Sequence, residues 1–361
     1  MTHLSTDTSY TALRLSIQQG KRISDEDILF LYHHATMAQL SQLATTVKKR
    51  YHSSDCATYL IMAIINYTNI CVAKCDYCAF YRLPHQKDTY LLSFEEICQK
   101  INALTALGGT MVAFNGGFHP KLKLQDYAEL FHKLHQKYPH LGFYEMTVAE
   151  FMFACKRSKT PYSDGAQMLK EAGSIWITGG GAEVLTESFR KRHSPGKFTC
   201  KDYYNAQRAL LNAQLGSTAT MVIGFDETTE ERFQHLKDLR TFQDSLEHKL
   251  HSFLCWTYKP DNTAFGGKEI DNEEYLKWMA ICRIYLDNFV HIRTSVLTQN
   301  KDALKALLYG ANDFDLPTED EVTEKAGAEI STDFQNILNY AKHLGFTLKH
   351  RKPWLPQPLR G

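Results

Sequence analysis

The sequence has no excess of either charge and no long apolar run. Its 361 residues contain 41 Lys and Arg against 40 Asp and Glu, so the composition points to no nucleic-acid partner and no charged interaction tail. No run reaches the roughly 18 apolar residues that a membrane-spanning helix needs. The first residues also lack the basic and apolar segments of a signal peptide. We therefore expect a cytoplasmic protein that binds neither nucleic acid nor a membrane.

The sequence also lacks the features of a disulfide-rich or multi-domain chain. Its nine cysteines are an odd number at ordinary density, and in a reducing compartment they are not expected to form a disulfide framework. No segment rich in Pro, Gly or Ser divides the chain. Apolar residues make up 43% of it, which is enough for a large core. We therefore expect one catalytic domain, in which clustered cysteines would bind metal or do chemistry.

Strand-like and helix-like segments alternate along most of the chain. Short apolar runs such as 58–65 are followed by amphipathic stretches such as 93–107. Eight such repeats, of which the last strand is weak, predict an α/β fold with a parallel sheet closed into a (β/α)8 TIM-type barrel. The predicted barrel spans residues 58–315, between a helical N-terminal extension over 1–57 and a helical C-terminal extension over 316–361. Function is then expected on the loops that follow the strands.

Three cysteines follow the first predicted strand in the pattern C-x3-C-x2-C. At this spacing Cys71, Cys75 and Cys78 can ligate three irons of a [4Fe-4S] cube and leave the fourth iron without a protein ligand. S-adenosylmethionine (SAM) chelates such an iron through its amino and carboxylate groups, and its reductive cleavage yields a 5′-deoxyadenosyl radical. The alternative is a zinc site, but zinc takes four ligands, usually in two pairs, and only His85 lies near enough to be a fourth. The other six cysteines are isolated and are expected to be small buried residues.

Two glycine-rich segments, Asn115-Gly116-Gly117 and Gly179-Gly180-Gly181, also follow predicted strands. Glycines there let the backbone approach a ligand and expose its N–H groups, although plain turn chemistry is the alternative for a single pair. Because both segments are expected at the functional end of the barrel, they predict ligand contact; they lack the G-x-G-x-x-G spacing of a dinucleotide site. His119 and Glu183 lie beside them. Either side chain could hydrogen-bond a ligand or move a proton, or be a solvated loop residue.

The segments around these residues resemble a known enzyme family. The stretch from Asn66 to Arg82 looks like the radical SAM enzymes that act on futalosine and deazaflavin precursors. Over about residues 24–345, the chain is similar to the cyclic dehypoxanthinyl futalosine synthase family of menaquinone biosynthesis. The segments that carry this resemblance are Asn115-Gly116-Gly117-Phe118-His119-Pro120, Gly179-Gly180-Gly181-Ala182-Glu183, His193-Ser194-Pro195-Gly196-Lys197, Trp256-Thr257-Tyr258-Lys259-Pro260-Asp261-Asn262-Thr263 and Gly310-Ala311-Asn312-Asp313-Phe314.

The sequence departs from the family pattern at three places. Where the family has Asp-Arg-Asn before I-N-Y-T-N, this chain has Met62-Ala63-Ile64. Where the family continues G-A-N-D-F with Gly-Gly-Thr, this chain has Asp315-Leu316-Pro317. The His of the family's G-H-x-E loop is Phe225 here. These changes leave the superfamily resemblance intact and bear on the exact substrate.

The resemblance implies a reaction, two cofactors and a set of site residues. In the family reaction, the radical takes hydrogen from ribose C4′ of dehypoxanthine futalosine, and the resulting carbon radical attacks the benzoate ring. The implied cofactors are one [4Fe-4S] cluster and SAM, and the implied partner is an electron donor such as flavodoxin or ferredoxin. The expected roles are metal ligation by Cys71, Cys75 and Cys78, cofactor binding by Tyr77, Phe80, Asn115, Gly116, Gly117, Gly180 and Glu183, and catalysis by Glu183 and His119.

Several assignments stay open at this point. Arg192 and Lys197 are candidates for binding the benzoate carboxylate, although the basic run 190–192 is also typical of a solvated helix end. Asn66 and Asn262 are candidates for lesser polar contacts. The rival functions are an aminofutalosine synthase, in which the radical adds to an enolpyruvyl substrate, a deazaflavin synthase component that acts on tyrosine, and a zinc-binding scaffold protein.

Overall fold

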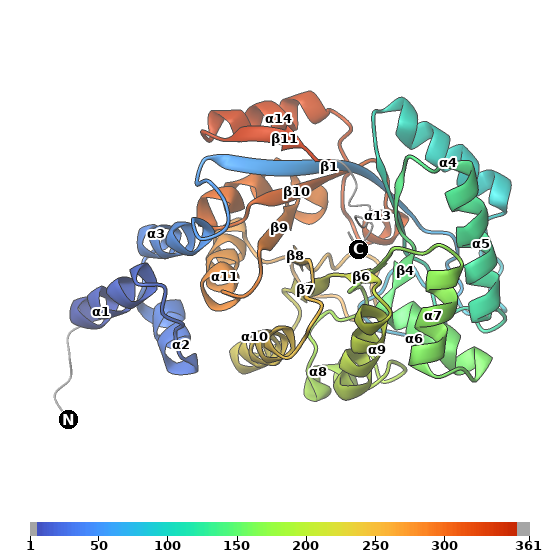
Figure 1. The fold of residues 1–361 in the computed structure, drawn as a ribbon, viewed down its shortest axis with the longest axis horizontal. Coiled ribbons are helices and arrows are strands. Elements are labelled where there is room, and N and C mark those ends of the chain that lie inside the picture. The colour runs from blue at the N-terminus through green and yellow to red at the C-terminus, as the bar shows by residue number, and fades with distance from the viewer. Residues whose placement is uncertain (1–5, 352–361) are drawn as a thin grey trace, which may run out of the picture.

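Three helices open the chain and lie to one side of the barrel (Figure 1). The computed structural model describes residues 6–351, so the outermost parts of both predicted extensions lie outside the described residues. The Ser24 hydroxyl accepts a hydrogen bond from the Asp27 N–H, and the Asp27 carboxylate accepts one from the Ser24 N–H, so the two residues cap the start of the second helix reciprocally. The third helix packs against a barrel helix, α11 (Asn272–Tyr285). The three are α1 (Thr6–Gln18), α2 (Asp25–His34) and α3 (Met37–Lys48).

The strands that follow confirm the predicted α/β barrel. They pair in parallel in the orders β3-β2-β1-β10-β9-β8-β7 and β4-β5-β6. Because β1 pairs with both β2 and β10, the first and last strand positions of the barrel are joined. These strands are β1 (Cys56–Ile65), β2 (Met111–Phe114), β3 (Gly142–Tyr144), β4 (Met146–Thr147), β5 (Trp176–Thr178), β6 (Gly216–Ser217), β7 (Ala219–Ile223), β8 (Ser252–Thr257), β9 (His291–Ser295) and β10 (Asp313–Pro317).

Two of the eight strand positions are interrupted by a single residue. Glu145 separates β3 from β4, and Thr218 separates β6 from β7. The buried Glu145 carboxylate accepts hydrogen bonds from the backbone N–H groups of Ile175 and Trp176, each at 2.9 Å, and lies 3.0 Å from His135 Nε2. The Glu145 side chain thus binds backbone N–H groups at the start of β5. The two interruptions divide the barrel into two hydrogen-bonded sheets.

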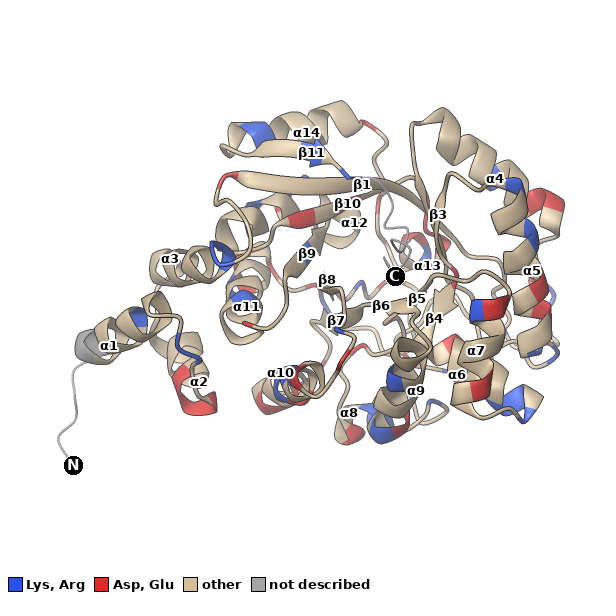
Figure 2. Ribbon diagram, in the orientation of Figure 1, with Lys and Arg blue, Asp and Glu red and all other residues tan. Residues whose placement is uncertain are grey.

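Helices connect the strands and cover the outside of the barrel (Figure 1). The hydroxyl of Ser93 and the carboxylate of Glu96 cap the first of them reciprocally. Lys, Arg, Asp and Glu are interspersed along these helices (Figure 2). The connecting helices are α4 (Phe94–Ala106), α5 (Leu124–Lys137), α6 (Val148–Ser158), α7 (Tyr162–Glu171), α8 (Glu187–His193), α9 (Cys200–Asn212), α10 (Thr229–Asp244), α11, α12 (Val296–Gln299) and the 3-10 helix η1 (Asn300–Tyr309).

The C-terminal part contains α13 (Glu321–Lys325), α14 (Phe334–His343) and a strand, β11 (Thr347–His350). β11 pairs in parallel with the start of β1. The prediction of a purely helical extension is therefore incomplete, because this short strand is largely exposed and shows no apolar alternation in the sequence. Within residues 6–351, no helix is long and apolar enough to cross a membrane.

Candidate active site

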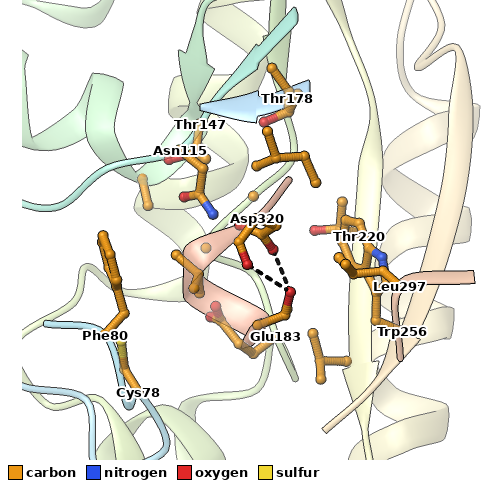
Figure 3. A pocket seen from close by; sticks show the side chains of 18 of the residues that line it. Cys78, Phe80, Asn115, Thr147, Thr178, Glu183, Thr220, Trp256, Leu297 and Asp320 are labelled. Atoms are coloured by element: carbon orange, nitrogen blue, oxygen red, sulfur yellow. Dashed lines mark hydrogen bonds between the residues drawn. The ribbon is translucent and has the colours of Figure 1, made fainter. Parts of the chain in front are cut away.

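A cavity of about 320 Å³ opens at the carboxyl ends of the barrel strands (Figure 3). The three predicted cluster cysteines and every residue predicted to bind a cofactor line it. Residues far apart in the sequence are therefore brought to one place, as expected for a barrel. The lining residues that the sequence singled out are Cys71, Cys75, Cys78, Tyr77, Phe80, Asn115, Gly116, Gly117, Gly180 and Glu183.

The cysteine loop is fixed to the first glycine segment by backbone contacts. The N–H of Phe118 donates to Cys71 Sγ at 3.3 Å, and the N–H of Val72 donates to the Phe118 carbonyl at 3.2 Å. A Cβ on Gly117 would lie 2.5 Å from the Ile70 carbonyl oxygen, and one on Gly116 would lie 2.6 Å from the Tyr67 ring. These glycines therefore serve the close approach of two loops, which the sequence analysis did not distinguish from ligand contact.

The three predicted cluster cysteines lie on the same cavity wall. A [4Fe-4S] cube needs its thiolate ligands separated across its corners, and three cysteines of one loop can supply three of them. Burial raises the pKa of Cys71 and Cys78 and raises that of Cys75 to about 12. The thiols are therefore neutral unless a metal centre supplies positive charge, as an iron–sulfur cluster would.

A histidine outside the predicted set supports the loop. His193 Nδ1 lies 2.9 Å from the Asp76 carboxylate and its Nε2 lies 2.7 Å from the Asp226 carboxylate. The Asp76 N–H also donates to the His193 carbonyl at 3.1 Å. A Cβ on Gly196, three residues later, would lie 2.4 Å from the Ala73 carbonyl oxygen. His193 and Gly196 belong to one of the segments that carry the family resemblance, and in the structure this segment holds the cysteine loop.

The second glycine segment presents Glu183 to the cavity. Glu183 has a positive φ of 45°, which is uncommon for a residue other than glycine. Its Oε2 lies 2.6 Å from Lys197 Nζ, which also donates to the Gly181 carbonyl at 3.2 Å. Burial lowers the pKa of Lys197, but Glu183 and Cys75 more than offset this and raise it above its usual value. Lys197 is therefore charged. In the structure it is paired with Glu183, so its predicted contact with a substrate carboxylate would have to form beside this ion pair.

Three other sequence candidates lie away from the cavity lining. His119 is buried outside it, and its Nδ1 accepts a hydrogen bond from the Lys121 N–H at 3.2 Å. Arg192 is bound by the carboxylates of Glu231 and Asp226. The Asn262 side chain donates to a backbone carbonyl of α13 at 2.9 Å. Local carboxylates thus already bind the Arg192 guanidinium, whereas only the Nδ1 atom of His119 has a protein partner. A catalytic role for His119 stays a prediction.

The three departures from the family pattern all reach the cavity wall. Met62 and Ile64 line it with apolar side chains. Phe225 lines it as well and packs against Tyr258, with ring centroids 4.4 Å apart. Asp315 lines it next to a residue that the sequence analysis missed, Arg293, to which it is hydrogen-bonded.

Further buried acidic groups accompany this pair. Arg293 Nε also donates to Asp313 at 2.9 Å, and Asp313 in turn binds Arg351 at 2.9 Å. Elsewhere on the wall, Glu150 accepts hydrogen bonds from the Tyr67 hydroxyl at 2.6 Å and from the Gly116 N–H at 3.0 Å. No motif quoted above contains Arg293, Glu150 or Arg351, because their partners come from other strands and helices.

Two family models match the chain. One, the radical SAM superfamily, matches residues 65–239, and the other, the CofH/MqnC C-terminal region, matches residues 247–355. Cyclic dehypoxanthine futalosine synthase from Halalkalibacterium halodurans is 34% identical over 90% of this chain and 89% of its own length. The enzyme of the same name from Streptomyces coelicolor is 33% identical over 90% of this chain and 83% of its own. Aminodeoxyfutalosine synthase from Thermus thermophilus is 30% identical over 86% and 85%.

A solved structure agrees with the fold. Methylornithine synthase (PylB) superposes with a TM-score of 0.72 at 16% identity, covering 94% of this chain and 97% of that one. With its barrel, cysteine loop and relatives, the chain belongs to the radical SAM superfamily of enzymes. Within that superfamily it is similar to the cyclic dehypoxanthine futalosine synthases, which confirms the family resemblance of its motifs.

Proposed function

We propose that this chain cyclises dehypoxanthine futalosine in menaquinone biosynthesis. The observation that carries this proposal is the 33–34% identity to two cyclic dehypoxanthine futalosine synthases over 90% of the chain, together with the cysteine-lined cavity. The volume of about 320 Å³ lies within the range of small-molecule sites. We place the enzyme in the cytoplasm, with a reduced flavodoxin or ferredoxin as its electron donor.

The residues present fit the implied cofactors. Cys71, Cys75 and Cys78 would hold the [4Fe-4S] cluster, and the glycine segments with Glu183 would bind SAM, whose amino group a carboxylate can grip. When bound, the cluster and SAM would supply the radical that removes hydrogen from ribose C4′. Tyr77 and Phe80, which line the cavity beside the cysteines, would wall the cofactors. His119, buried outside the lining, would act only through its neighbours.

The chain's own contribution would be positioning and exclusion of water. Apolar side chains from β1, β8 and α12 form much of the cavity wall: Met62, Ile64, Leu254, Trp256 and Leu297. Such a wall shields a radical from solvent and holds the ribose and the benzoate ring close enough to react. Two strand loops and the cysteine loop meet there through backbone contacts, so the geometry is set by rigid elements of the barrel.

A second candidate function is supported by one specific observation. The Thermus thermophilus relative, 30% identical over 86% of the chain, is an aminodeoxyfutalosine synthase. In that chemistry the adenosyl carbon of SAM enters the product, whereas in the cyclisation it leaves as 5′-deoxyadenosine. Mass spectrometry of the two products therefore distinguishes the candidates.

The test is anaerobic reconstitution of the full chain with iron and sulfide, followed by SAM, reductant and dehypoxanthine futalosine. We expect about four irons per chain and a product lighter than the substrate by two hydrogens, with 5′-deoxyadenosine formed alongside. Untouched dehypoxanthine futalosine in the presence of a full cluster would overturn the proposed function. One zinc per chain in place of iron would favour the scaffold alternative.

A further inference from the structure

Asp320 is a buried carboxylate that faces the cavity without a full set of partners. It lies between β10 and α13, lines the cavity and is only 3% exposed (Figure 3). One carboxylate oxygen, Oδ2, accepts a hydrogen bond from Thr323 Oγ1 at 2.7 Å. The other, Oδ1, is buried and has no hydrogen-bond partner among residues 6–351. A buried acceptor left in this state is costly, and in native proteins it calls for a ligand or an ordered molecule.

No cation of the cavity wall is left to neutralise Asp320. Lys197 is bound to Glu183, Lys259 to Glu269 at 2.7 Å, and Arg293 to Asp313 and Asp315. Burial raises the pKa of Asp320 to about 6, against the lowering effect of the hydrogen bond from Thr323. The group therefore titrates near neutrality and is available as an acceptor inside the cavity.

The segment that carries Asp320 is held on two sides. On one side, the N–H of Ile64 donates to the Glu319 carbonyl at 3.1 Å, and the N–H of Thr318 donates to the Met62 carbonyl at 2.8 Å. On the other side, the N–H of Asp261 donates to a carbonyl of this segment, that of Ala326, at 3.2 Å. The carboxylate is therefore held in place by β1 and by the loop after β8, as a preorganised binding group would be.

We propose that Asp320 is a substrate-binding residue whose free carboxylate oxygen accepts a hydrogen bond from a ribose hydroxyl of the nucleoside-type substrate. The inference rests on the proposed function, since that substrate carries a ribose. SAM carries one too, but Asp320 follows the last barrel strand, beside Met62 and Ile64, whereas the glycine segments assigned to SAM follow β2 and β5. The substrate ribose is therefore the donor that the placement favours.

The first experiment compares Asp320→Asn with the unmodified holoenzyme. Asn keeps the shape and can still accept from Thr323, but it can present an NH₂ donor where Oδ1 accepts. We expect the KM for dehypoxanthine futalosine to rise about 10- to 100-fold, the range for a hydrogen bond to a charged group, with SAM affinity and iron content unchanged. Glu324→Gln, which removes an exposed charge from the same short helix, is the matched control and should behave as the unmodified protein.

A second measurement separates binding from folding. A substrate analogue that lacks the bound ribose hydroxyl should bind the unmodified enzyme more weakly than the substrate does. In Asp320→Asn, the same analogue and the substrate should bind about equally well, because the substitution has already removed that hydrogen bond. Equal losses in both proteins for every hydroxyl would overturn the inference. A fall in SAM affinity with an unchanged substrate KM would also overturn it and assign the hydroxyl to SAM. Unmodified enzyme that leaves the substrate untouched would overturn the proposed function as well, and the two failures are thus distinguishable.

Discussion

Two walls of one cavity are built in different ways. The cysteine wall consists of the loop 71–78 and the glycine segments 115–117 and 179–181, and it is fixed mainly by backbone contacts at positions where a Cβ would clash. The divergent wall consists of Met62, Ile64, Arg293, Asp315 and Asp320, from the adjacent strands β9, β10 and β1 and the segment before α13. The shape and polarity of this wall are set by its side chains and their charges.

The difference teaches which part of the site is general and which is particular to this chain. Enzymes that bind a [4Fe-4S] cluster and SAM need cysteine ligands and a backbone that can approach the ligand closely, and cysteine and glycine provide these two features. Substrate recognition depends on side chains that can change without disturbing the barrel. Two of the three departures from the family pattern lie on the divergent wall, and the third, Phe225, packs beside the cysteine loop, 5.3 Å from the Tyr77 ring.

The largest expected effect breaks the cysteine wall outright. In Cys75→Ala one iron loses its ligand, so we expect loss of the visible cluster absorbance and a fall in turnover of at least about 10³-fold, with the fold intact. Iron analysis and far-ultraviolet circular dichroism check this. Cys56→Ala is the matched control, since Cys56 lies at the start of β1 and not on the cavity. A full cluster in Cys75→Ala would contradict the ligand assignment.

The next effect breaks the divergent wall without touching the cofactors. Arg293→Met leaves Asp315 buried without its cation, which costs about 3–5 kcal/mol in the free energy of unfolding. Urea denaturation of the purified chain measures it. Replacing both partners, in Arg293→Met with Asp315→Leu, should recover most of the loss.

An exposed ion pair provides the comparison for that variant. Lys305 and Asp302 are paired with 39% and 50% of their side chains exposed, so Lys305→Met should cost no more than about 1 kcal/mol. Equal costs for Arg293→Met and Lys305→Met would show that the ion pair of the divergent wall is not a buried one in solution.

A smaller effect sharpens the role of the second glycine segment. Glu183→Gln removes the charge that pairs with Lys197 and, in our proposal, grips the SAM amino group. The SAM dissociation constant should rise about tenfold or more, as measured by equilibrium binding to the reconstituted protein. Glu171→Gln, on the exposed side of α7, should leave it unchanged. If both variants bind SAM equally well, Glu183 serves only to hold Lys197.

The smallest expected effect concerns how the free energy of unfolding depends on pH through one buried group near each wall. Burial, aided by Arg190, lowers the pKa of His235 to about 3, and its Nδ1 accepts from the Leu185 N–H just after the second glycine segment. Because the unfolded chain binds a proton near pH 6.5 and the folded one does not, this contribution is lost as pH falls from about 6.5 towards 3. On the divergent wall, burial raises the pKa of Asp313 but Arg351 and Arg293 lower it to about 2, so its contribution is lost only below about pH 4.

Unfolding measured against pH tests this comparison. His235→Gln keeps an acceptor for Leu185 but cannot take up a proton, so stability should fall less steeply with acid between about pH 6.5 and 3, by up to about 1.4 kcal/mol per pH unit. The same slope in both proteins would mean that His235 titrates normally in the folded state.

The sequence predicted much of the cysteine wall and little of the divergent wall. Cys71 to Cys78 and the two glycine segments are contiguous patterns, so their chemistry can be read locally. Arg293 and Asp315 meet only because β9 and β10 pair in the register that places Arg293 opposite Asp313. That register, like the buried position of Asp320, depends on barrel closure and leaves no periodic signal. For the same reason, the sequence did not predict that His119 is buried outside the cavity lining, because the course of a loop depends on its tertiary contacts.

The most direct test of the proposed cyclisation follows the hydrogen on ribose C4′ of the substrate. Dehypoxanthine futalosine deuterated at ribose C4′ is turned over anaerobically by the reconstituted chain, and the 5′-deoxyadenosine is examined by mass spectrometry. The account predicts one deuterium in 5′-deoxyadenosine and a cyclised product that has lost it. Adenosyl carbon in the product, or 5′-deoxyadenosine free of deuterium, would contradict it.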